Sequence, residues 1–137
     1  MTATRAELAD RLAGYDSLVE VGIGRRPEVA AALADAGSDV TATDVFDAPV
    51  PAGVRFVRDD VVDRAAELDG DAHPGDPYRV DAVYALNLPA ELQAPVRDVA
   101  TAAAAACLFT TLGFEEPTVP VARESVGRET LYLARQR

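Results

Sequence analysis

Lysine and tryptophan are absent from this 137-residue chain, and cysteine, histidine and methionine each occur once. The lone cysteine, Cys107, cannot form an internal disulfide and favours a reducing, cytoplasmic setting. With His73 as the only histidine, a zinc site built from several Cys and His ligands is excluded, and a Ser-His-Asp triad would have to use His73. We therefore expect no bound metal, and the sequence shows no obvious catalytic residue.

Long hydrophobic runs are also missing. No segment approaches the roughly 20 apolar residues that are needed to cross a bilayer. The first residues, "MTATRAELADRLAG", form an acidic amphipathic segment that is unlike a secretory signal. Hydrophobic residues still make up 49% of the chain, enough for a real core. We expect one cytoplasmic domain over residues 1–137, without a membrane partner.

Positive charge is scarce and of one kind. All 13 basic residues are arginine, against 23 acidic residues, and the net charge is -10. Lysine scarcity with abundant Asp, Ala, Val and Thr is typical of a protein from a salt-loving archaeon. At molar salt the Debye length is about 3 Å, so a carboxylate-rich surface is screened and stays hydrated. Acidity normally argues against nucleic-acid binding, but here it can reflect the solvent alone, so nucleic acid stays open as a partner.

Apolar periodicity and Gly/Pro punctuation predict alternating strands and helices. A short helix follows Thr4, which has Glu7 in capping-box spacing. Expected strands cover 17–23, 39–45, 54–57, 80–86 and 107–112, and expected helices cover 26–37, 59–68 and 95–107, the last starting near Pro95. We expect a terminal hairpin, with strands over 118–123 and 129–134 and a turn over 124–128. Pro120 would belong to an edge strand if it is in a strand at all.

This order predicts a three-layer α/β/α, Rossmann-like fold. Strands that alternate with helices form right-handed βαβ units and a mostly parallel, twisted sheet, here of about seven strands with a C-terminal antiparallel hairpin. Two crossover helices look missing, one within "FDAPVPAG" and one within "GFEEP". We therefore expect part of the sheet to be poorly covered, and a homodimer to cover it.

The turn after the first strand is a candidate ligand site. Gly22 and Gly24 in "VEVGIGRRP" permit positive φ and close backbone approach, and the helix that follows offers unpaired N–H groups. Strand–glycine–helix also occurs as a plain connection. A dinucleotide fingerprint would need a third glycine where Pro27 stands, which weakens a nicotinamide interpretation.

Glu20, Gly22 and Gly24 resemble motif I of class I S-adenosylmethionine-dependent methyltransferases, which reads acidic residue, any, Gly, any, Gly, any, Gly. The last glycine of that motif is replaced by Arg26. The resemblance implies that Asp44, at the end of the second strand, holds the ribose hydroxyls. It also implies that Asp59 or Asp60, after the third strand, contacts the adenine amino group, although either acid is equally well explained as a helix N-cap.

Two further positions lie in the expected fourth strand or just after it. Asn87-Leu88-Pro89 faintly resembles the Asn-Pro-Pro turn of amino-group methyltransferases, with one proline missing. Tyr84 could stack on a substrate base, or it could be a core residue with its hydroxyl at the rim. The small size of the chain and Arg25-Arg26 after the turn are similar to an uncharacterised archaeal family of minimal Rossmann-like domains.

Arg25 and Arg26 lie at a helix N-terminus, where the helix dipole favours anions rather than cations. They could pair with acidic neighbours, or they could bind a phosphate, a carboxylate or an RNA backbone. Arg26 could clamp the carboxylate of the cofactor's methionine part, or it could block the cofactor and select a phosphate.

Three functions remain open from the sequence. The first is binding of S-adenosylmethionine, with or without methyl transfer to an unknown acceptor, at Glu20, Gly22, Gly24, Arg26, Asp44 and Asp60. The second is a non-catalytic subunit that binds a nucleotide or a protein partner through the same crevice. The third is a small dinucleotide-binding domain. In each nucleotide-binding case the partner is a small nucleotide-like molecule.

Overall fold

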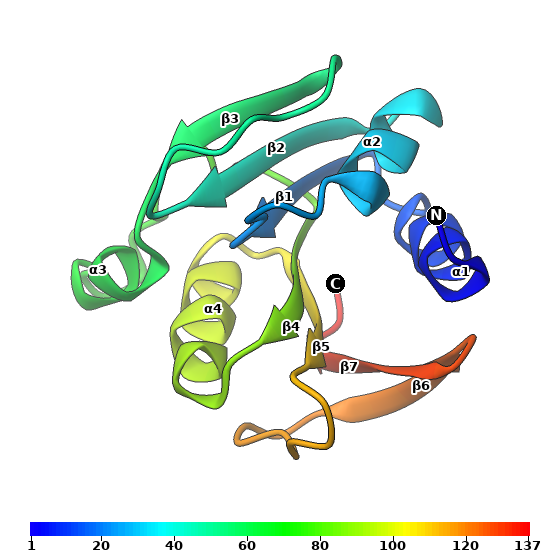
Figure 1. Cartoon of the computed structure of the whole chain (residues 1–137). Helices are drawn as coiled ribbons and strands as arrows, with labels where there is room; N and C mark the ends of the chain where they lie inside the picture. The colour runs from blue at the N-terminus through cyan, green and yellow to red at the C-terminus, as the bar shows by residue number, and fades with distance from the viewer.

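The computed structural model describes all residues, 1–137, as a sheet with helices on both faces (Figure 1). The layers confirm the predicted three-layer α/β/α architecture. In chain order the elements are α1 (Ala3–Leu12), β1 (Ser17–Val21), α2 (Glu28–Asp35), β2 (Asp39–Asp44), β3 (Val54–Arg58), α3 (Val61–Ala66), β4 (Ala82–Leu88), α4 (Ala90–Ala102), β5 (Ala106–Thr111), β6 (Ala122–Val126) and β7 (Glu129–Arg135).

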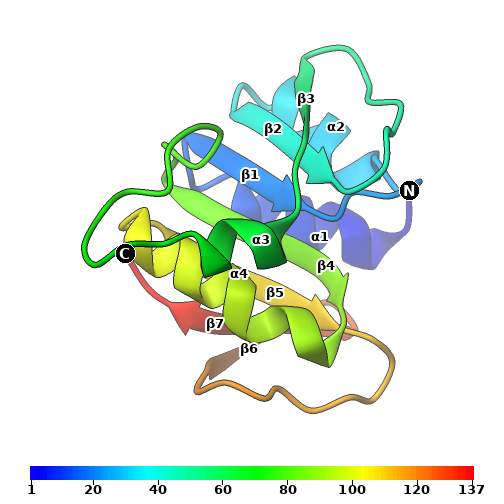
Figure 2. The same ribbon diagram turned by 90° about the vertical axis from the view of Figure 1, so that its left-hand side faces the viewer.

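The sheet has seven strands in the order β3-β2-β1-β4-β5-β7-β6. The first five run parallel, and β7 is antiparallel both to β5 and to β6, as the predicted terminal hairpin requires. The carboxyl ends of β1, β2, β4 and β5 point to one edge, where the chain's N terminus also lies (Figure 2). Ligands of open parallel sheets bind beyond this edge, at the point where the strand order reverses. Here that point lies between β1 and β4.

Two apolar clusters fill the space between the layers. On one face, Leu8 and Leu12 of α1 and Leu33 of α2 pack on the sheet, and on the other face α3 and α4 do so. Side chains alternate between the faces as a strand demands: Leu18 belongs to the first cluster, and Val19 and Val21 belong to the second. Glu20 shares the first face with Leu18, and it lies at 2% exposure beneath α1 and α2.

No helix connects β2 to β3 or β5 to β6, as the two proline-containing segments predict. Extended chain takes the place of each helix. Ala48 and Val50 of segment 45–53 pack against the first cluster, and Val119 and Val121 of segment 112–121 pack against the second. The sheet faces are therefore better covered than expected, and the exposure is concentrated on the edge strands β3 and β6. The homodimer stays a prediction.

Several predicted boundaries are wrong. The N-cap of α1 is Thr2, whose hydroxyl accepts from the Arg5 N–H, so the helix begins two residues before the expected capping box. The helix α4 begins at Ala90 and contains Pro95, because Ala90 to Gln93 are strong helix formers and one proline in the second turn does not prevent the helix. The first strand of the terminal hairpin, β6, covers Ala122–Val126 instead of 118–123, so it includes most of the predicted turn 124–128, and Pro120 precedes it.

None of the helices has the length and apolarity that crossing a bilayer would require.

Candidate functional site

The chain leaves β1 through a turn that only glycine accepts easily. Gly22 has φ of 73° and Gly24 has φ of 55°, in the left-handed region where a side chain is strained. A Cβ at either position would meet no atom within 4 Å, so the glycines leave open space above the turn. The N–H groups of Gly22 and Ile23 both donate to the carbonyl of Thr43 on β2. The turn is therefore anchored to the sheet on one side and open on the other.

A cavity of about 300 Å³ lies in this open space. We call it the glycine-turn cavity. It is lined by Arg5 of α1, by the turn after β1, and by residues at the ends of β4 and β5: Arg5, Glu20, Gly22, Ile23, Gly24, Arg25, Arg26, Leu86, Asn87 and Leu112. Four of the six predicted site residues therefore line one cavity, and Arg26 forms part of its wall.

Asp44 lies beside this turn rather than among the lining residues. Its Oδ2 accepts from the Gly24 N–H at 2.8 Å, and its Oδ1 accepts from the Phe46 N–H at 3.2 Å. Each carboxylate oxygen keeps a second lone pair, so Asp44 can still accept from a hydroxyl. Asp44 thus ties the end of β2 to the glycine turn, a structural task that the sequence interpretation missed.

Glu20 is a buried acid with one hydrogen bond. Its register partner on β4 is Tyr84, and the Tyr84 hydroxyl donates to Glu20 Oε1 at 2.7 Å. Burial raises the pKa of Glu20 to about 7, against the opposing effects of the Tyr84 hydrogen bond and the positive charge of Arg5. Tyr84 is fully buried, so it cannot stack on a ligand, and its hydroxyl serves Glu20 instead of lying at the rim.

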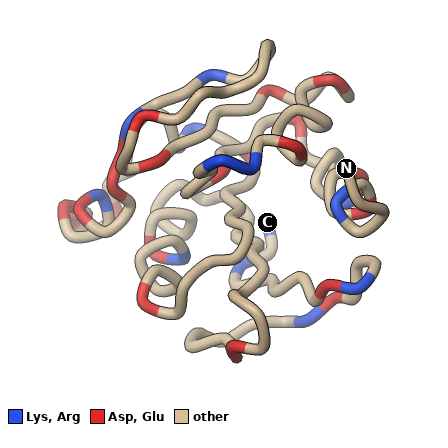
Figure 3. The backbone as a smooth tube through the Cα atoms, viewed as in Figure 1, with Lys and Arg blue, Asp and Glu red and all other residues tan.

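Arg25 and Arg26 make no side-chain hydrogen bond and no ion pair in the structure. The predicted pairing with Glu28, Glu20 or Asp47 is therefore absent: Glu28 lies near Arg5 instead, at 3.7 Å. In the charge-coloured trace the connection between β1 and α2 is basic, whereas acidic positions lie on both sides of the sheet (Figure 3). The two guanidinium groups remain available to a ligand.

The acids after β3 are both in use. Asp60 is the N-cap of α3, and its Oδ1 accepts from the N–H groups of Val62 and Asp63. Asp59 accepts from Arg64 at 2.7 Å and from the Tyr78 hydroxyl at 2.6 Å. Burial and the Asp59 carboxylate raise the pKa of Tyr78 well above its usual value. Asp59 and Asp60 both line a separate cavity of about 450 Å³, together with Val45 of the segment after β2. The Oδ2 atom of Asp60 has no partner in the chain.

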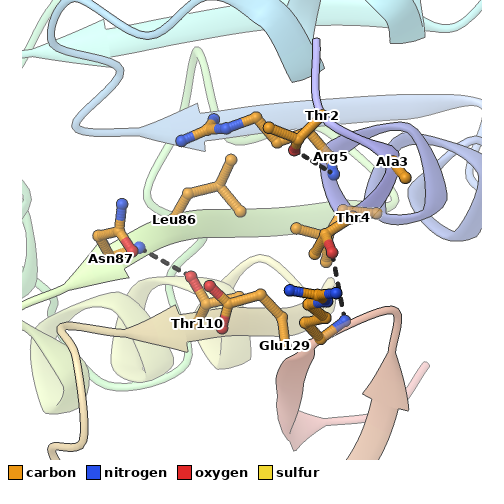
Figure 4. A pocket seen from close by; sticks show the side chains of 10 residues that line it. Thr2, Ala3, Thr4, Arg5, Leu86, Asn87, Thr110 and Glu129 are labelled. Carbon is orange, nitrogen blue, oxygen red and sulfur yellow. Dashed lines mark hydrogen bonds between the residues drawn. The ribbon is translucent and has the colours of Figure 1, made fainter.

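Another cavity adjoins the glycine-turn cavity, and no pattern in the sequence predicts it. We call it the hairpin cavity, because the β6–β7 hairpin closes one side of it (Figure 4). Its volume is about 450 Å³, and it shares Arg5, Leu86 and Asn87 with the glycine-turn cavity. The other lining residues come from α1, β5 and the hairpin: Thr2, Ala3, Thr4, Leu8, Thr110, Arg128 and Glu129.

Asn87 stands where the two cavities meet, near the end of β4. It has φ of 54°, and its N–H donates to the Thr110 hydroxyl at 2.8 Å. The faint resemblance at Asn87-Leu88-Pro89 therefore falls on a residue with an unusual backbone conformation that lines both cavities. His73 and Cys107 lie away from both: His73 is exposed and Cys107 is buried.

The sequence comparisons agree over nearly the whole chain. The model of UPF0146, described as an uncharacterised protein family, matches residues 3–137. The chain belongs to the UPF0146 family. A UPF0146 protein from Halobacterium salinarum is 52% identical over 125 residues, which cover 90% of this chain and 91% of that protein. A UPF0146 protein from Archaeoglobus fulgidus is 37% identical over 95 residues, covering 69% of this chain and 67% of that protein.

Solved structures that resemble this chain include methyltransferases of low sequence identity. A ribosomal protein L11 methylase from Lactobacillus delbrueckii has a TM-score of 0.56 at 15% identity, with 97% of this chain and 78% of that chain covered. Magnesium protoporphyrin IX methyltransferase from Synechocystis, solved with bound SAH, has a TM-score of 0.55 at 13% identity, with 95% and 82% covered.

An O-methyltransferase family protein from Burkholderia thailandensis has a TM-score of 0.54 at 15% identity over 93% of the UPF0146 chain. The UPF0146 chain spans only 55% of the length of that protein. These likenesses show that the chain has the fold of class I methyltransferases.

Proposed function

We propose that this chain binds S-adenosylmethionine in the glycine-turn cavity and transfers its methyl group to an acceptor in the adjoining space. The observation that carries the proposal is the charge pattern of this cavity. Glu20, a buried carboxylate without an ion-pair partner, and Arg25 and Arg26, two arginines without partners, line one cavity over an open glycine turn. A ligand with both a cationic and an anionic group would satisfy both.

The amino-acid end of S-adenosylmethionine has this character, with an ammonium and a carboxylate close together. An ammonium near Glu20 would compensate a carboxylate whose burial is costly without a partner. A guanidinium from Arg25 or Arg26 would hold the carboxylate through charge-assisted hydrogen bonds. Arg26 stands at the position of the motif's last glycine. In this proposal its side chain contacts the ligand, whereas the glycine of the motif leaves room for it.

The remaining parts of the ligand have matching groups at the same sheet edge. Asp44 at the end of β2 would accept from the ribose hydroxyls with its free lone pairs, and Asp60 Oδ2 would accept from the adenine amino group. The strand order 3-2-1-4-5-7-6 favours this ligand over a dinucleotide, whose usual domain has the order 3-2-1-4-5-6.

When bound, S-adenosylmethionine supplies an electrophilic methyl group. The chain's own contribution would be to hold the acceptor in line with that group and to keep water out, because positioning alone can supply a large part of such a barrier. No strong acid or base is required, so the scarcity of histidine and cysteine is no obstacle.

Ligand-induced stabilisation in molar salt tests the proposal. S-adenosylmethionine, S-adenosylhomocysteine, NAD and ATP are compared by thermal unfolding. A ligand at 100 times its Kd should raise the free energy of unfolding by about 2.7 kcal/mol. We expect the two adenosyl compounds to do so and NAD and ATP not to. Stabilisation by NAD alone would favour the dinucleotide interpretation, and no stabilisation by any of them would favour a non-catalytic interaction subunit.

Asp44→Ala should abolish the stabilisation, because it removes the ribose acceptor and the tie to Gly24. Asp47→Ala is the matched control, since Asp47 is an exposed acid of the same segment with no hydrogen bond in the structure. If Asp44→Ala binds S-adenosylhomocysteine as tightly as the parent chain, our placement of the ribose is wrong.

A further inference from the structure

The arginines of this chain divide into two groups. Eight of the 13 form an ion pair with a carboxylate. Arg58 and Arg135 donate to the backbone carbonyls of Val45 and Ala105. Only Arg25, Arg26 and Arg128 have side chains without any partner. In a chain with 23 carboxylates, an unpaired arginine is the exception.

All three unpaired arginines line the two adjoining cavities. Arg25 and Arg26 line the glycine-turn cavity, and Arg128 lines the hairpin cavity. Arg5, whose contact with Glu28 is a long one at 3.7 Å, lines both. The hairpin cavity thus has two guanidinium groups and one carboxylate, that of Glu129, in a molecule with a net charge of -10. Its charge is opposite to that of the rest of the chain.

Close packing between the two ends of the chain builds the hairpin cavity and positions Arg128. The backbone N–H of Arg128 donates to the Thr4 hydroxyl at 3.2 Å, and this hydrogen bond joins the β6–β7 turn to α1. The preceding residue, Gly127, has φ of 59°, and a Cβ there would lie 2.8 Å from Glu7 Oε2 and 2.9 Å from Thr4 Oγ1. A side chain at 127 is therefore disfavoured both by the backbone conformation and by the contact with α1. The wall that carries Arg128 is specified by this packing.

The opposite wall carries neutral polar groups. Asn87 presents an amide at the junction of the two cavities, and Thr110 fixes its backbone. Thr4, Thr110 and Glu129 surround the same opening, with Leu86 on its floor (Figure 4). Glu129 and the Asn87 carbonyl can accept hydrogen bonds from a hydroxyl or an amine, while Arg5 and Arg128 can donate to an oxyanion.

We propose that the hairpin cavity binds a small molecule that carries an oxyanion, either a carboxylate or a phosphate, together with a hydroxyl or amino group. Arg128 and Arg5 hold the oxyanion, and Asn87 and Glu129 hold the hydroxyl or amine. A volume of about 450 Å³ suits a small molecule rather than a folded partner. At molar salt, charges act only over about one Debye length of 3 Å, so recognition requires direct guanidinium contact of this kind.

This molecule is the methyl acceptor, and only that role rests on the function proposed above. The hydroxyl or amine beside Asn87 faces the junction with the glycine-turn cavity, so it is the group that would receive the methyl. Its oxygen or nitrogen would bond to the methyl carbon as the bond from that carbon to the sulfonium sulfur breaks, S-adenosylhomocysteine would leave, and Glu129 or solvent would take the released proton. Anion binding by the hairpin cavity itself can be measured without any cofactor.

Three matched probes test the inference at constant ionic strength: glycerol, glycerate and glycerol 3-phosphate. They share hydroxyl groups and differ in the oxyanion, and a short RNA oligonucleotide is run beside them as a polymeric anion. We expect glycerate or glycerol 3-phosphate to shift the amide NMR signals of Thr4, Asn87 and Arg128, and glycerol to leave them unchanged. Whichever anion binds more tightly identifies the oxyanion. Equal shifts with glycerol, no shift with either anion, or shifts only with a short RNA oligonucleotide would overturn the inference.

Arg128→Gln should weaken binding of the anionic probe about tenfold or more, the loss expected for a charge-assisted contact. Arg123→Gln is the control, because Arg123 lies on the same hairpin, carries the same charge, and pairs with Glu116 outside both cavities. Both variants should keep the parent's affinity for S-adenosylhomocysteine. If no variant binds S-adenosylhomocysteine, the proposed function fails while the anion result stands, and an equal loss of anion binding in Arg128→Gln and Arg123→Gln contradicts the inference.

Discussion

The segments that follow β1 and β3 lie at the same edge of the sheet, and they treat their charges in opposite ways. After β3, Asp59 is bonded to Arg64 and to Tyr78, and Asp60 caps α3. After β1, Arg25 and Arg26 have no partner, and the glycines leave open space beside them. Asp59 and Asp60 after β3 are both bonded within the fold, whereas the two arginines after β1 have no partner in it.

Because of this difference, substitutions in the two segments should have different effects, one on the stability of the fold and the other on ligand binding. Replacing a residue of the β3 segment removes bonds that hold the folded state together, whereas replacing an arginine of the β1 segment removes nothing that the folded chain uses. The β1 segment is therefore the better indicator of a ligand, although both segments match the methyltransferase pattern. The following changes test this separation.

The largest loss of stability is expected for Asp59→Ala. The Asp59 side chain is 11% exposed, and its removal leaves the Arg64 guanidinium unpaired and the buried Tyr78 hydroxyl without an acceptor. We expect the free energy of unfolding to fall by roughly 2–4 kcal/mol, measured by urea unfolding. Asp60→Ala, which removes only the N-cap, should cost about 1 kcal/mol. Equal losses would show that the network around Asp59 contributes no more than a helix cap.

The next effect is expected for Gly127→Ala. The left-handed φ and the close approach of Glu7 and Thr4 together should cost roughly 1–3 kcal/mol and displace the hairpin from α1. Gly70→Ala is the control, because Gly70 has a similar φ of 56° but open space around its Cα. Only Gly127→Ala should also weaken binding of the anionic probe. A similar loss of anion binding in Gly70→Ala would argue against a role for this contact.

A pH-dependent effect is expected at Glu20. Its pKa is about 7 in the folded chain, above the ordinary value of 4.5, so the folded state holds the proton more tightly than the unfolded state. The stabilising effect of protonated Glu20 is therefore complete below pH 4.5 and is lost as the pH rises to about 7. Glu20→Gln keeps an acceptor for Tyr84 and cannot ionise. We expect it to gain roughly 2–3 kcal/mol relative to the parent between pH 5 and pH 8, measured by thermal unfolding, because each pH unit between the two pKa values changes the free energy of unfolding by about 1.4 kcal/mol.

A constant difference between Glu20→Gln and the parent chain across this pH range would contradict the assignment of the titration to Glu20. The same variant should bind S-adenosylhomocysteine more weakly than the parent chain at pH 8, because the ionised carboxylate is the proposed partner of the ligand's ammonium.

The smallest change in stability is expected for the double variant Arg25→Gln, Arg26→Gln, within about 0.5 kcal/mol of the parent chain. Its affinity for S-adenosylhomocysteine should fall about tenfold or more, because the ligand's carboxylate loses its charged partners. Methylthioadenosine, which lacks the amino-acid end, is the matched ligand and should bind both chains alike. A parallel loss with both ligands would place the arginines near the adenosine instead.

Local patterns predicted most of the fold and four residues that line the glycine-turn cavity. The glycine pair, the acid at the end of β2 and the order of elements depend on residues close together in sequence or on strand alternation, so they could be read directly. The start of α4 could not, because propensity and the proline gave opposite indications. The double use of Asp44, as a turn anchor and as the proposed ribose ligand, also became visible only in the hydrogen bonds.

The hairpin cavity could not be predicted, because its walls come from positions more than a hundred residues apart. Thr4 and Arg128 meet only after the sheet is complete, and no periodicity in either segment reports the other. The sequence allows Arg25 and Arg26 either to pair with acidic neighbours or to remain free for a ligand. Only the positions of the surrounding acids in the fold distinguish these two alternatives. Which charges pair depends on the fold of the whole chain, so the ion pairs can be identified only in the structure.

The hydrogen bond between Thr4 and the β6–β7 turn also has a consequence for biosynthesis. Translation releases α1 first and β7 last, so the glycine turn can form its sheet contacts with β2 while the final hairpin is still inside the ribosome. The space beside Arg128 is enclosed only when that hairpin emerges and docks on the first helix. The nascent polypeptide would thus form the turn of the glycine-turn cavity before the hairpin cavity.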